Sequence, residues 1–272
     1  MEENVLTLDQ VSFQYQDDHA WVLDGINIIL RPGDKVGMVG DNGCGKSTIT
    51  KLILGIEKPV KGEVKLCNEV VSWSRHYPEV GYIGDPGYSS EMLGLPVSVT
   101  VKTLVEVVEQ IYGEGVRELI TLLDIESLYG KENQNLSTGE RKRVMALLAL
   151  SKPNRLLILD EPFDGLDKHY REVMFILLQG YLTPEVSLLF IGHSRIEIDL
   201  FTDKVFRIIK GKLVPEAQNK FSVTVSSKSQ EPLVSIKKSG VFQYELNRML
   251  ESKEVENEIS FSLIQIDETK EI

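Results

Sequence analysis

Short apolar runs separated by polar turns dominate the first third of the chain. They occupy residues 5–15, 22–30, 36–39, 63–66 and 80–84. Runs of this length, bounded by Gly, Pro, Asn and Asp, predict β-strands. The polar turn between the first two runs favours a small antiparallel sheet beside the main fold.

A different spacing occupies the middle of the chain. Apolar side chains recur at Val101, Leu104, Val105, Val108 and Ile111, and the pattern continues over residues 116–123. Offsets of three and four residues place such side chains on one face of a helix. Residues 141–150 predict a third, strongly amphipathic helix. Together these stretches predict a helical insert over about residues 86–150.

From residue 156 onward, apolar strands alternate with helical segments. We expect strands at 156–159 and 188–191, helices near 168–180 and 195–200, and a hairpin over 203–214. Such alternation predicts an α/β fold with a mainly parallel sheet flanked by helices. One domain is therefore expected over residues 1–214. An appendage is expected over residues 215–272, and no pattern in it indicates a function.

Composition narrows the class of protein. The 272 residues are 42% hydrophobic and 26% charged, which is typical of a globular chain, and the formal net charge is -11. Without a basic stripe, this acidity argues against a nucleic-acid partner, because phosphates would be repelled. No apolar run approaches the ~20 residues that cross a bilayer, so we expect no direct membrane span. Cys44 and Cys67 form no disulfide framework, which favours a reducing, intracellular compartment.

The sequence GDNGCGKS, at residues 40–47, carries the strongest chemical signal. It follows a predicted strand and precedes an apolar helix start. Glycines let backbone N–H groups converge on an anion, and a helix N-terminus adds partial positive charge. Lys46 would contact the β- and γ-phosphates, and Ser47 would offer its hydroxyl to Mg²⁺. The spacing predicts the phosphate loop of a P-loop NTPase, rather than a glycine turn beside a solvated lysine.

Two adjacent carboxylates, Asp160 and Glu161, follow the strand predicted at 156–159. Open α/β sheets bind ligands at the carboxyl ends of their strands. Asp160 would hold Mg²⁺ through its water shell, while Glu161 would polarise an attacking water. An Asp-Glu pair after a strand also begins ordinary loops. The phosphate loop upstream favours the catalytic interpretation.

The sequence LSTGE, at residues 136–140, precedes a predicted helix. Its serine and glutamate have the S-x-x-E spacing of a capping box, so a well-capped helix is one interpretation. The order of motifs supports a second, because LSTGE precedes the carboxylate pair, the sequence GLD at 165–167 and a strand that ends in His193. In this combination, residues 5–214 resemble the nucleotide-binding domain of the ABC ATPase family.

The resemblance implies a role for each motif. It equates Lys46 with the Walker A lysine, Glu161 with the catalytic glutamate, and His193 with the switch histidine that contacts the γ-phosphate or the attacking water. Tyr15 would stack on adenine, although an ordinary strand tyrosine is the alternative. The nucleotide contacts implied are Tyr15, Asp41, Asn42, Gly43, Cys44, Gly45, Lys46, Ser47, Thr48, Ser137, Gly139 and Asp167. The metal ligands implied are Ser47, Asp160 and Asp85, so ATP and Mg²⁺ are the expected cofactors.

The family mechanism also implies partners. Two domains meet head to tail, so that the helix capped by Ser137 in one faces the phosphate held by Lys46 in the other. We expect a homodimer that hydrolyses ATP to power a transporter with separate permease subunits. Such a chain would be cytoplasmic, and peripheral at the inner face of the membrane through that partner. The alternative is a soluble ABC ATPase that remodels or regulates a protein complex.

Several positions depart from the commonest family pattern. Asp85 stands where a glutamine is usual, and it would either offer an oxygen to Mg²⁺ or serve as a turn residue before a proline. Thr138 and Glu140 replace the commonest glycine and glutamine. The pairing of LSTGE with DEPFDGLD is most similar to soluble ATP-binding proteins of the molybdenum-operon or photorepair type. Cys44 is either a reactive thiol at a helix N-terminus or a small side chain tolerated in the loop.

Overall fold

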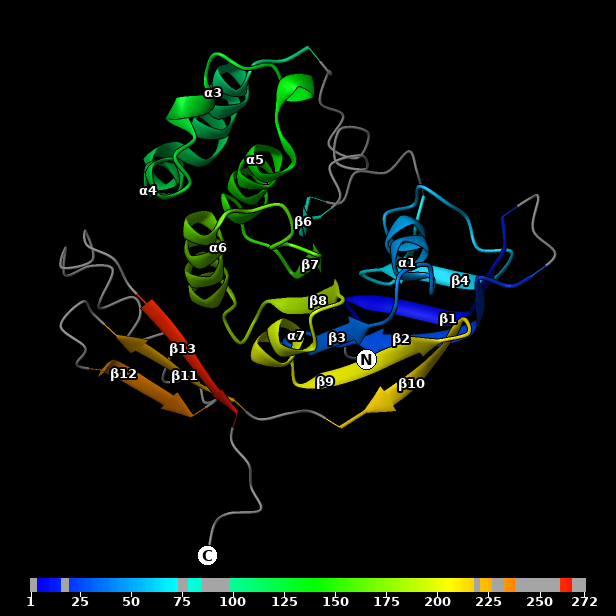
Figure 1. Cartoon of the computed structure of the whole chain (residues 1–272). Helices are drawn as coiled ribbons and strands as arrows, with labels where there is room; N and C mark the ends of the chain where they lie inside the picture. The colour runs from blue at the N-terminus through cyan, green and yellow to red at the C-terminus, as the bar shows by residue number, and fades with distance from the viewer. Residues whose placement is uncertain are drawn as a thin grey trace, which may run out of the picture.

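A six-stranded sheet forms the centre of the molecule (Figure 1). The computed structural model describes residues 4–15, 20–72, 78–84, 98–217, 221–226, 232–237 and 260–265. The central sheet has the order β10-β9-β3-β8-β7-β6. Its strands are β3 (Lys35–Val39), β6 (Val80–Ile83), β7 (Leu156–Asp160), β8 (Ser187–Gly192), β9 (Lys204–Ile209) and β10 (Lys212–Glu216). All neighbours pair in parallel except β9 and β10, which form the expected terminal hairpin.

The central strands are buried on both faces because helices and a second sheet cover them. Successive residues of β7 point to opposite faces, so Leu157 and Leu159 pack in one hydrophobic core while Leu156 and Ile158 pack in another. The first core includes side chains of α6 (Lys168–Tyr181) and α7 (Arg195–Phe201), and the second includes those of α1 (Lys46–Ile53). This double burial explains why the strands appear in the sequence as unbroken apolar runs.

An antiparallel sheet with the order β2-β1-β4-β5 packs beside α1, as the early apolar runs predict. It comprises β1 (Leu6–Phe13), β2 (Leu23–Leu30), β4 (Lys61–Leu66) and β5 (Glu69–Val70). Leu6 lies opposite Leu30 on one side and Leu66 on the other. All three leucines are buried, so this register holds the sheet against the second core.

Helices gather at the end of the molecule away from this sheet (Figure 1). They are α3 (Val101–Tyr112), α4 (Arg117–Leu122) and α5 (Thr138–Leu150), with short 3₁₀ turns at Gly113–Val116, Glu126–Leu128 and Asn133–Asn135. The prediction that α5 is strongly amphipathic is wrong, because residues 142–147 are all buried, Lys142 and Arg143 included. The helix lies between the other helices and the sheet, and its charged side chains find partners inside the protein.

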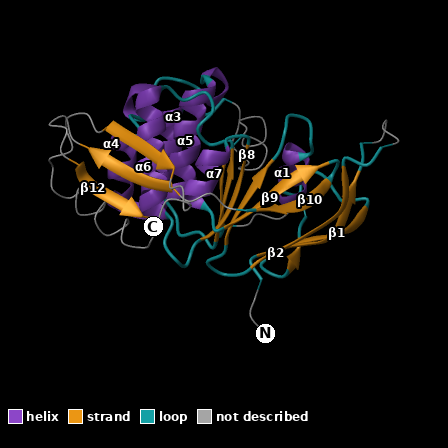
Figure 2. Ribbon diagram, turned by 60° about the horizontal axis from the view of Figure 1, so that its bottom comes forward, coloured by secondary structure: helices purple, strands orange, loops and turns teal. Residues whose placement is uncertain are grey.

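A third sheet, with the order β12-β11-β13, lies beyond the end of β10 (Figure 2). Its antiparallel strands are β11 (Phe221–Ser226), β12 (Pro232–Lys237) and β13 (Ser260–Gln265). Strand β10 ends at Glu216, two residues past the predicted domain boundary. The division of the chain into a domain and an appendage stays a prediction.

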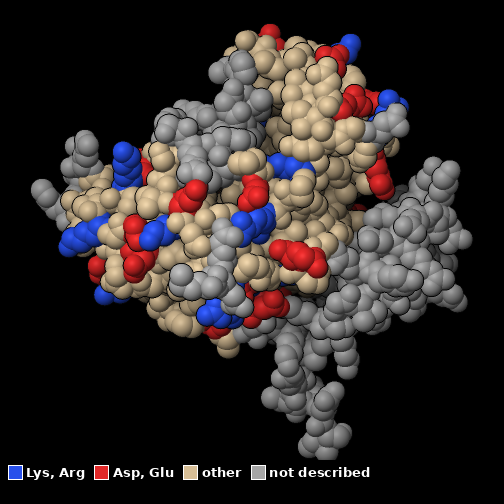
Figure 3. All heavy atoms as spheres, turned by 180° about the vertical axis from the view of Figure 1, so that it is seen from behind, with Lys and Arg blue, Asp and Glu red and all other residues tan. Residues whose placement is uncertain are grey.

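The surface charges are mixed where the structure describes them. Figure 3, which views the molecule from behind, shows acidic and basic side chains interspersed rather than gathered by sign. Among the described helices, none has both the length and the apolar character needed to cross a membrane.

Candidate nucleotide-binding site

The phosphate loop joins β3 to α1, and glycines permit its path. Gly43 and Gly45 have φ angles of 79° and 110°, a region that side chains with a Cβ rarely adopt. A Cβ on Gly45 would lie 2.8 Å from Leu23 Cδ2, and one on Gly40 would lie 2.4 Å from Cys44 Sγ. The loop is therefore a close-packed turn that ends where the N-terminus of α1 begins, the arrangement that binds phosphate in other proteins.

Lys46 folds back over the loop that precedes it. Its Nζ donates hydrogen bonds to the carbonyl oxygens of Gly40, at 2.7 Å, and Asp41, at 3.2 Å. The Glu161 carboxylate lies 3.9 Å from the same nitrogen. The residue is only 6% exposed, so its charge is held close to the loop by these acceptors. A phosphate oxygen bound in the loop would accept hydrogen bonds from Lys46 Nζ in place of these carbonyl oxygens.

Asp160, the last residue of β7, is tied to the first helix. Thr50 Oγ1, on α1, donates a 2.8 Å hydrogen bond to Asp160 Oδ2, and both residues are buried. Ser47 lies one turn earlier on α1 and is exposed. A hydroxyl and a carboxylate are the oxygen donors that Mg²⁺ prefers, so Ser47 and Asp160 suit this ion.

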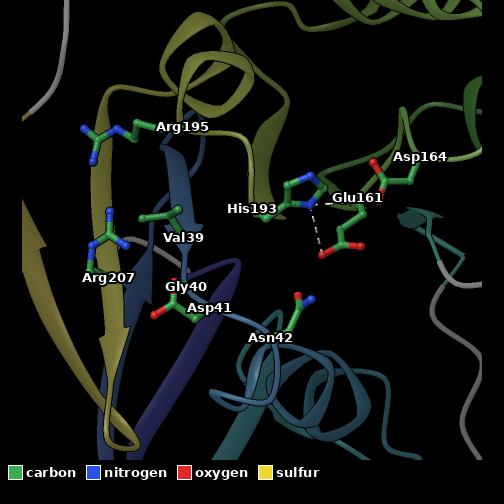
Figure 4. Close-up of a pocket in the computed structure, with 9 residues that line it drawn as sticks. All are labelled: Val39, Gly40, Asp41, Asn42, Glu161, Asp164, His193, Arg195 and Arg207. Atoms are coloured by element: carbon green, nitrogen blue, oxygen red, sulfur yellow. Dashed lines mark ion pairs between the residues drawn. The ribbon is translucent and has the colours of Figure 1, made fainter.

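Glu161 and His193 follow the neighbouring strands β7 and β8 and face each other (Figure 4). His193 Nδ1 lies 3.6 Å from Glu161 Oε1 and 3.9 Å from Asp164 Oδ2. Glu161 has a positive φ of 50°, a strained conformation for a residue other than glycine. Its N–H donates to Ile191 O at 2.9 Å, and Lys142 Nζ donates to its carbonyl oxygen. These backbone contacts hold the strained residue in place.

A pocket of about 410 Å³ opens in front of the phosphate loop (Figure 4). Its lining comprises Val39, Gly40, Asp41, Asn42, Glu161, Asp164, His193, Arg195 and Arg207. It thus brings together part of the phosphate loop and the predicted catalytic pair. Asp164 and the two arginines were missed by the sequence analysis. The one sequence signal for Asp164 is its place in DEPFDGLD, where it is an acidic residue three positions after Glu161.

Three predicted contact residues lie apart from this pocket. Ser137 caps α5, accepting from the Glu140 N–H while the Glu140 side chain accepts from the Ser137 N–H, so the capping box is confirmed. Asp167 caps α6 by accepting from the Tyr170 N–H at 3.0 Å. Gly139 packs on the loop that precedes α6. None of the three lines the pocket of its own chain.

The remaining predicted positions surround the loop or lie elsewhere. Tyr15 is 37% exposed, and its hydroxyl lies 3.3 Å from Thr48 Oγ1. Its ring meets that of Phe13 edge-on at 4.9 Å. Cys44 is half-buried. Asp85 lies outside the described residues, so its two interpretations stay open.

Comparison with known proteins identifies the family. The family model described as ABC transporter matches residues 23–164, more than half of the chain. This chain belongs to the ABC transporter family. An ABC ATPase domain binds ATP, and the predicted P-loop α/β fold is confirmed by solved structures of the family.

Several curated ABC proteins are similar in sequence. The Fe(3+) ions import ATP-binding protein FbpC 2 of Rhodococcus jostii is 28% identical over 71% of this chain and 57% of its own length. The Nod factor export ATP-binding protein I of Burkholderia pseudomallei is 30% identical over 78% of this chain and 70% of its own. The chain spans about three fifths of the length of the first curated relatives it matches.

Two solved ABC structures show the same fold. The cbiO1 protein from Clostridium perfringens, part of the ABC transporter complex cbiONQ, superposes with a TM-score of 0.59 at 24% identity, over 93% of this chain and 96% of that one. The ATP-binding cassette MJ0796, solved as a dimer bound to ADP and Pi, gives a TM-score of 0.63 at 20% identity, over 78% of this chain and 98% of that one. At these identities the likeness concerns the fold.

Proposed function

We propose that this ABC-family chain binds ATP with Mg²⁺ and hydrolyses it as a head-to-tail dimer, and that hydrolysis powers a transporter with separate membrane-spanning subunits. One observation carries the proposal. The phosphate loop, Glu161 and His193 all follow the carboxyl ends of parallel strands, namely β3, β7 and β8, and line one pocket. The curated relatives named as import and export ATP-binding proteins support the transport role.

Residues in and next to this pocket would divide the chemistry among them. Lys46, now bonded to carbonyl oxygens of the loop, would turn to the β- and γ-phosphates. Ser47 and Asp160 would hold Mg²⁺, which neutralises phosphate charge when bound. Glu161 would accept a proton from the attacking water. His193, 3.6 Å from Glu161, would orient that carboxylate and contact the terminal phosphate.

Among the residues that the structure describes, those expected to face the terminal phosphate from the opposite side do not line the pocket of their own chain. Ser137 and Gly139 stand at the N-terminus of α5, outside the pocket of their own chain. The partial positive charge of a helix N-terminus suits a phosphate supplied by a second copy. ATP would therefore bridge two chains, and hydrolysis would release them.

A soluble ABC ATPase that acts on a protein complex is the second candidate. It is favoured by the absence of any glutamine from residue 77 to residue 109, where the family usually has one. Purification of the native protein from membranes separates the two candidates. A polytopic membrane protein in stoichiometric complex with the chain supports transport, while a soluble complex supports the alternative.

Light scattering of wild type and Glu161→Gln, with and without Mg-ATP, tests the dimer and the catalytic assignment. We expect the variant to form a stable ATP-bound dimer because it binds ATP but does not hydrolyse it, while wild type turns ATP over. Glu118→Gln, on the exposed surface of α4, is the matched control and should behave as wild type. A monomeric Glu161→Gln protein at saturating ATP would contradict the homodimer.

A further inference from the structure

Two arginines form the wall of the pocket that lies opposite the catalytic pair, Glu161 and His193. Arg195 lies at the start of α7 and Arg207 on β9, and Figure 4 shows their guanidinium groups on one side, across from Glu161. Arg207 pairs in register with Val39, the residue before the phosphate loop. The known motifs of the chain give neither arginine a role.

Both arginines are held by one carboxylate, that of Glu216 at the end of β10. Arg207 Nε pairs with Glu216 Oε1, and Arg195 Nη1 pairs with Oε2. Arg195 also donates to Asp199 Oδ2, at 2.8 Å, and to Ala217 O. The hydrogen bond from Arg207 holds the pKa of Glu216 below its ordinary value, so the carboxylate is ionised at neutral pH.

Three carboxylates surround the two guanidinium groups. Asp199 and Glu216 form ion pairs with them, and Asp41 of the phosphate loop acts electrostatically on Arg207. Asp199 is a buried residue of α7, whereas the Glu216 side chain is 25% exposed and belongs to the edge strand β10. Withdrawal of Glu216 would remove one negative charge from this wall of the pocket. The wall would then attract phosphates more strongly, because Arg195 and Arg207 are partly buried, with side chains 19% and 35% exposed, and solvent screens them less than free side chains.

We propose that Glu216 is a latch that neutralises Arg195 and Arg207 and thereby limits how tightly the pocket retains nucleotide phosphates. The inference rests on the proposed function, since it regulates the same nucleotide pocket. Glu216 and Ala217 stand where the chain leaves the central sheet. A displacement of the end of β10 that withdraws Glu216 from the two arginines would strengthen retention of the product ADP. Because coupling between two sites is reciprocal, ADP in the pocket would weaken the ion pairs of Glu216 with the two arginines.

Calorimetric titration of the full chain with ADP tests the latch. We expect Glu216→Gln to lower the Kd for ADP about threefold to tenfold at about 50 mM salt, and the gain to shrink at about 0.5 M salt as charges are screened. Asp24→Asn is the matched control. Asp24 pairs with Lys212 at 3.3 Å at the opposite end of β10, so this variant removes an anchor of the same strand but leaves the pocket intact. Its Kd should equal that of wild type.

A second variant separates charge from structural damage. Adding Arg207→Gln to Glu216→Gln should return the Kd toward the wild-type value, and thermal unfolding should show all variants folded. A Glu216→Gln protein that binds ADP no more tightly than wild type, or whose gain survives loss of Arg207, would overturn the latch. Absence of ADP binding by both proteins would do the same. Wild type that binds ADP but never hydrolyses ATP would contradict the proposed function alone.

Discussion

Thr50 shows how one hydroxyl joins two motifs that lie far apart in the chain. It stands on α1 within the turn that follows the phosphate loop, and it donates to Asp160, 110 residues later. A threonine at this position carries no signal in the sequence, because it fits the helix as well as other small polar residues do. The contact fixes one oxygen of a predicted metal ligand relative to the phosphate loop.

Thr50→Val removes this hydrogen bond with little change of volume. We expect the free energy of unfolding to fall by about 1.5–3 kcal/mol, because a buried acceptor that carries charge loses its donor. Urea denaturation without nucleotide measures it. Thr121→Val, on the exposed side of α4, removes a hydroxyl bonded only within its helix and should change stability by less than about 0.5 kcal/mol. Equal effects of the two variants would argue against the role of Thr50.

Helix α5 and the loop before α6 touch through two glycines. A Cβ on Gly139 would lie 2.6 Å from Gly165 O, and one on Gly165 would lie 3.0 Å from Thr138 Cγ2. Gly165 also has a φ of 75°, which favours glycine. The threonine that departs from the family pattern therefore packs against the GLD sequence. Two segments that carry predicted nucleotide contacts, Gly139 and Asp167, therefore touch each other within one chain.

Gly139→Ala should push these segments apart. The added methyl meets backbone rather than a flexible side chain, so we expect a loss of about 1–3 kcal/mol in the free energy of unfolding and a lower ATPase rate. Gly115→Ala is the control, since nothing lies within 4 Å of its Cβ position. It should leave both quantities near wild type. An unchanged ATPase rate in Gly139→Ala would show that close approach is not needed there.

Helix α5 also shows where a sequence pattern misleads. Its arginines and lysine suggested a solvent face, yet Arg143 is 5% exposed. The guanidinium group lies 4.0 Å from the centre of the Tyr170 ring and donates to Leu123 O at 2.9 Å. Tyr170 in turn donates to Asp124 Oδ2 at 2.9 Å. A buried charge of this kind depends on partners from two other segments of the chain, which periodicity cannot reveal.

At the scale of the whole molecule, stability should fall in acid. Hydrogen bonds from the Lys131 side chain and the Ser137 N–H hold the pKa of Glu140 below its ordinary value. Because the folded-state value is lowered, this carboxylate stabilises the fold above its unfolded pKa, and the contribution is lost as pH falls through the folded pKa. Burial raises the pKa of Glu197, whose contribution therefore has the opposite sign.

Denaturation from about pH 6 to about pH 3 tests this linkage. Wild type should be more stable than Glu140→Gln near pH 6, and the difference should vanish as pH falls, because the protonated carboxyl resembles the amide. Glu118→Gln, exposed on α4, is the control for loss of one negative charge. A difference between wild type and Glu140→Gln that persists at pH 3 would show that another interaction of Glu140 is responsible.

Local patterns determined most of the fold and the core of the site. The apolar runs of β3, β7 and β8 and the residues that follow each strand were predictable, because burial on both faces and tight phosphate turns restrict composition locally. Only the tertiary structure decided which other side chains join them. The order β9-β3-β8-β7 brings Arg207 beside the phosphate loop, and the turn after β7 brings Asp164 to His193. Such contacts depend on strand order and register, and no single segment encodes those.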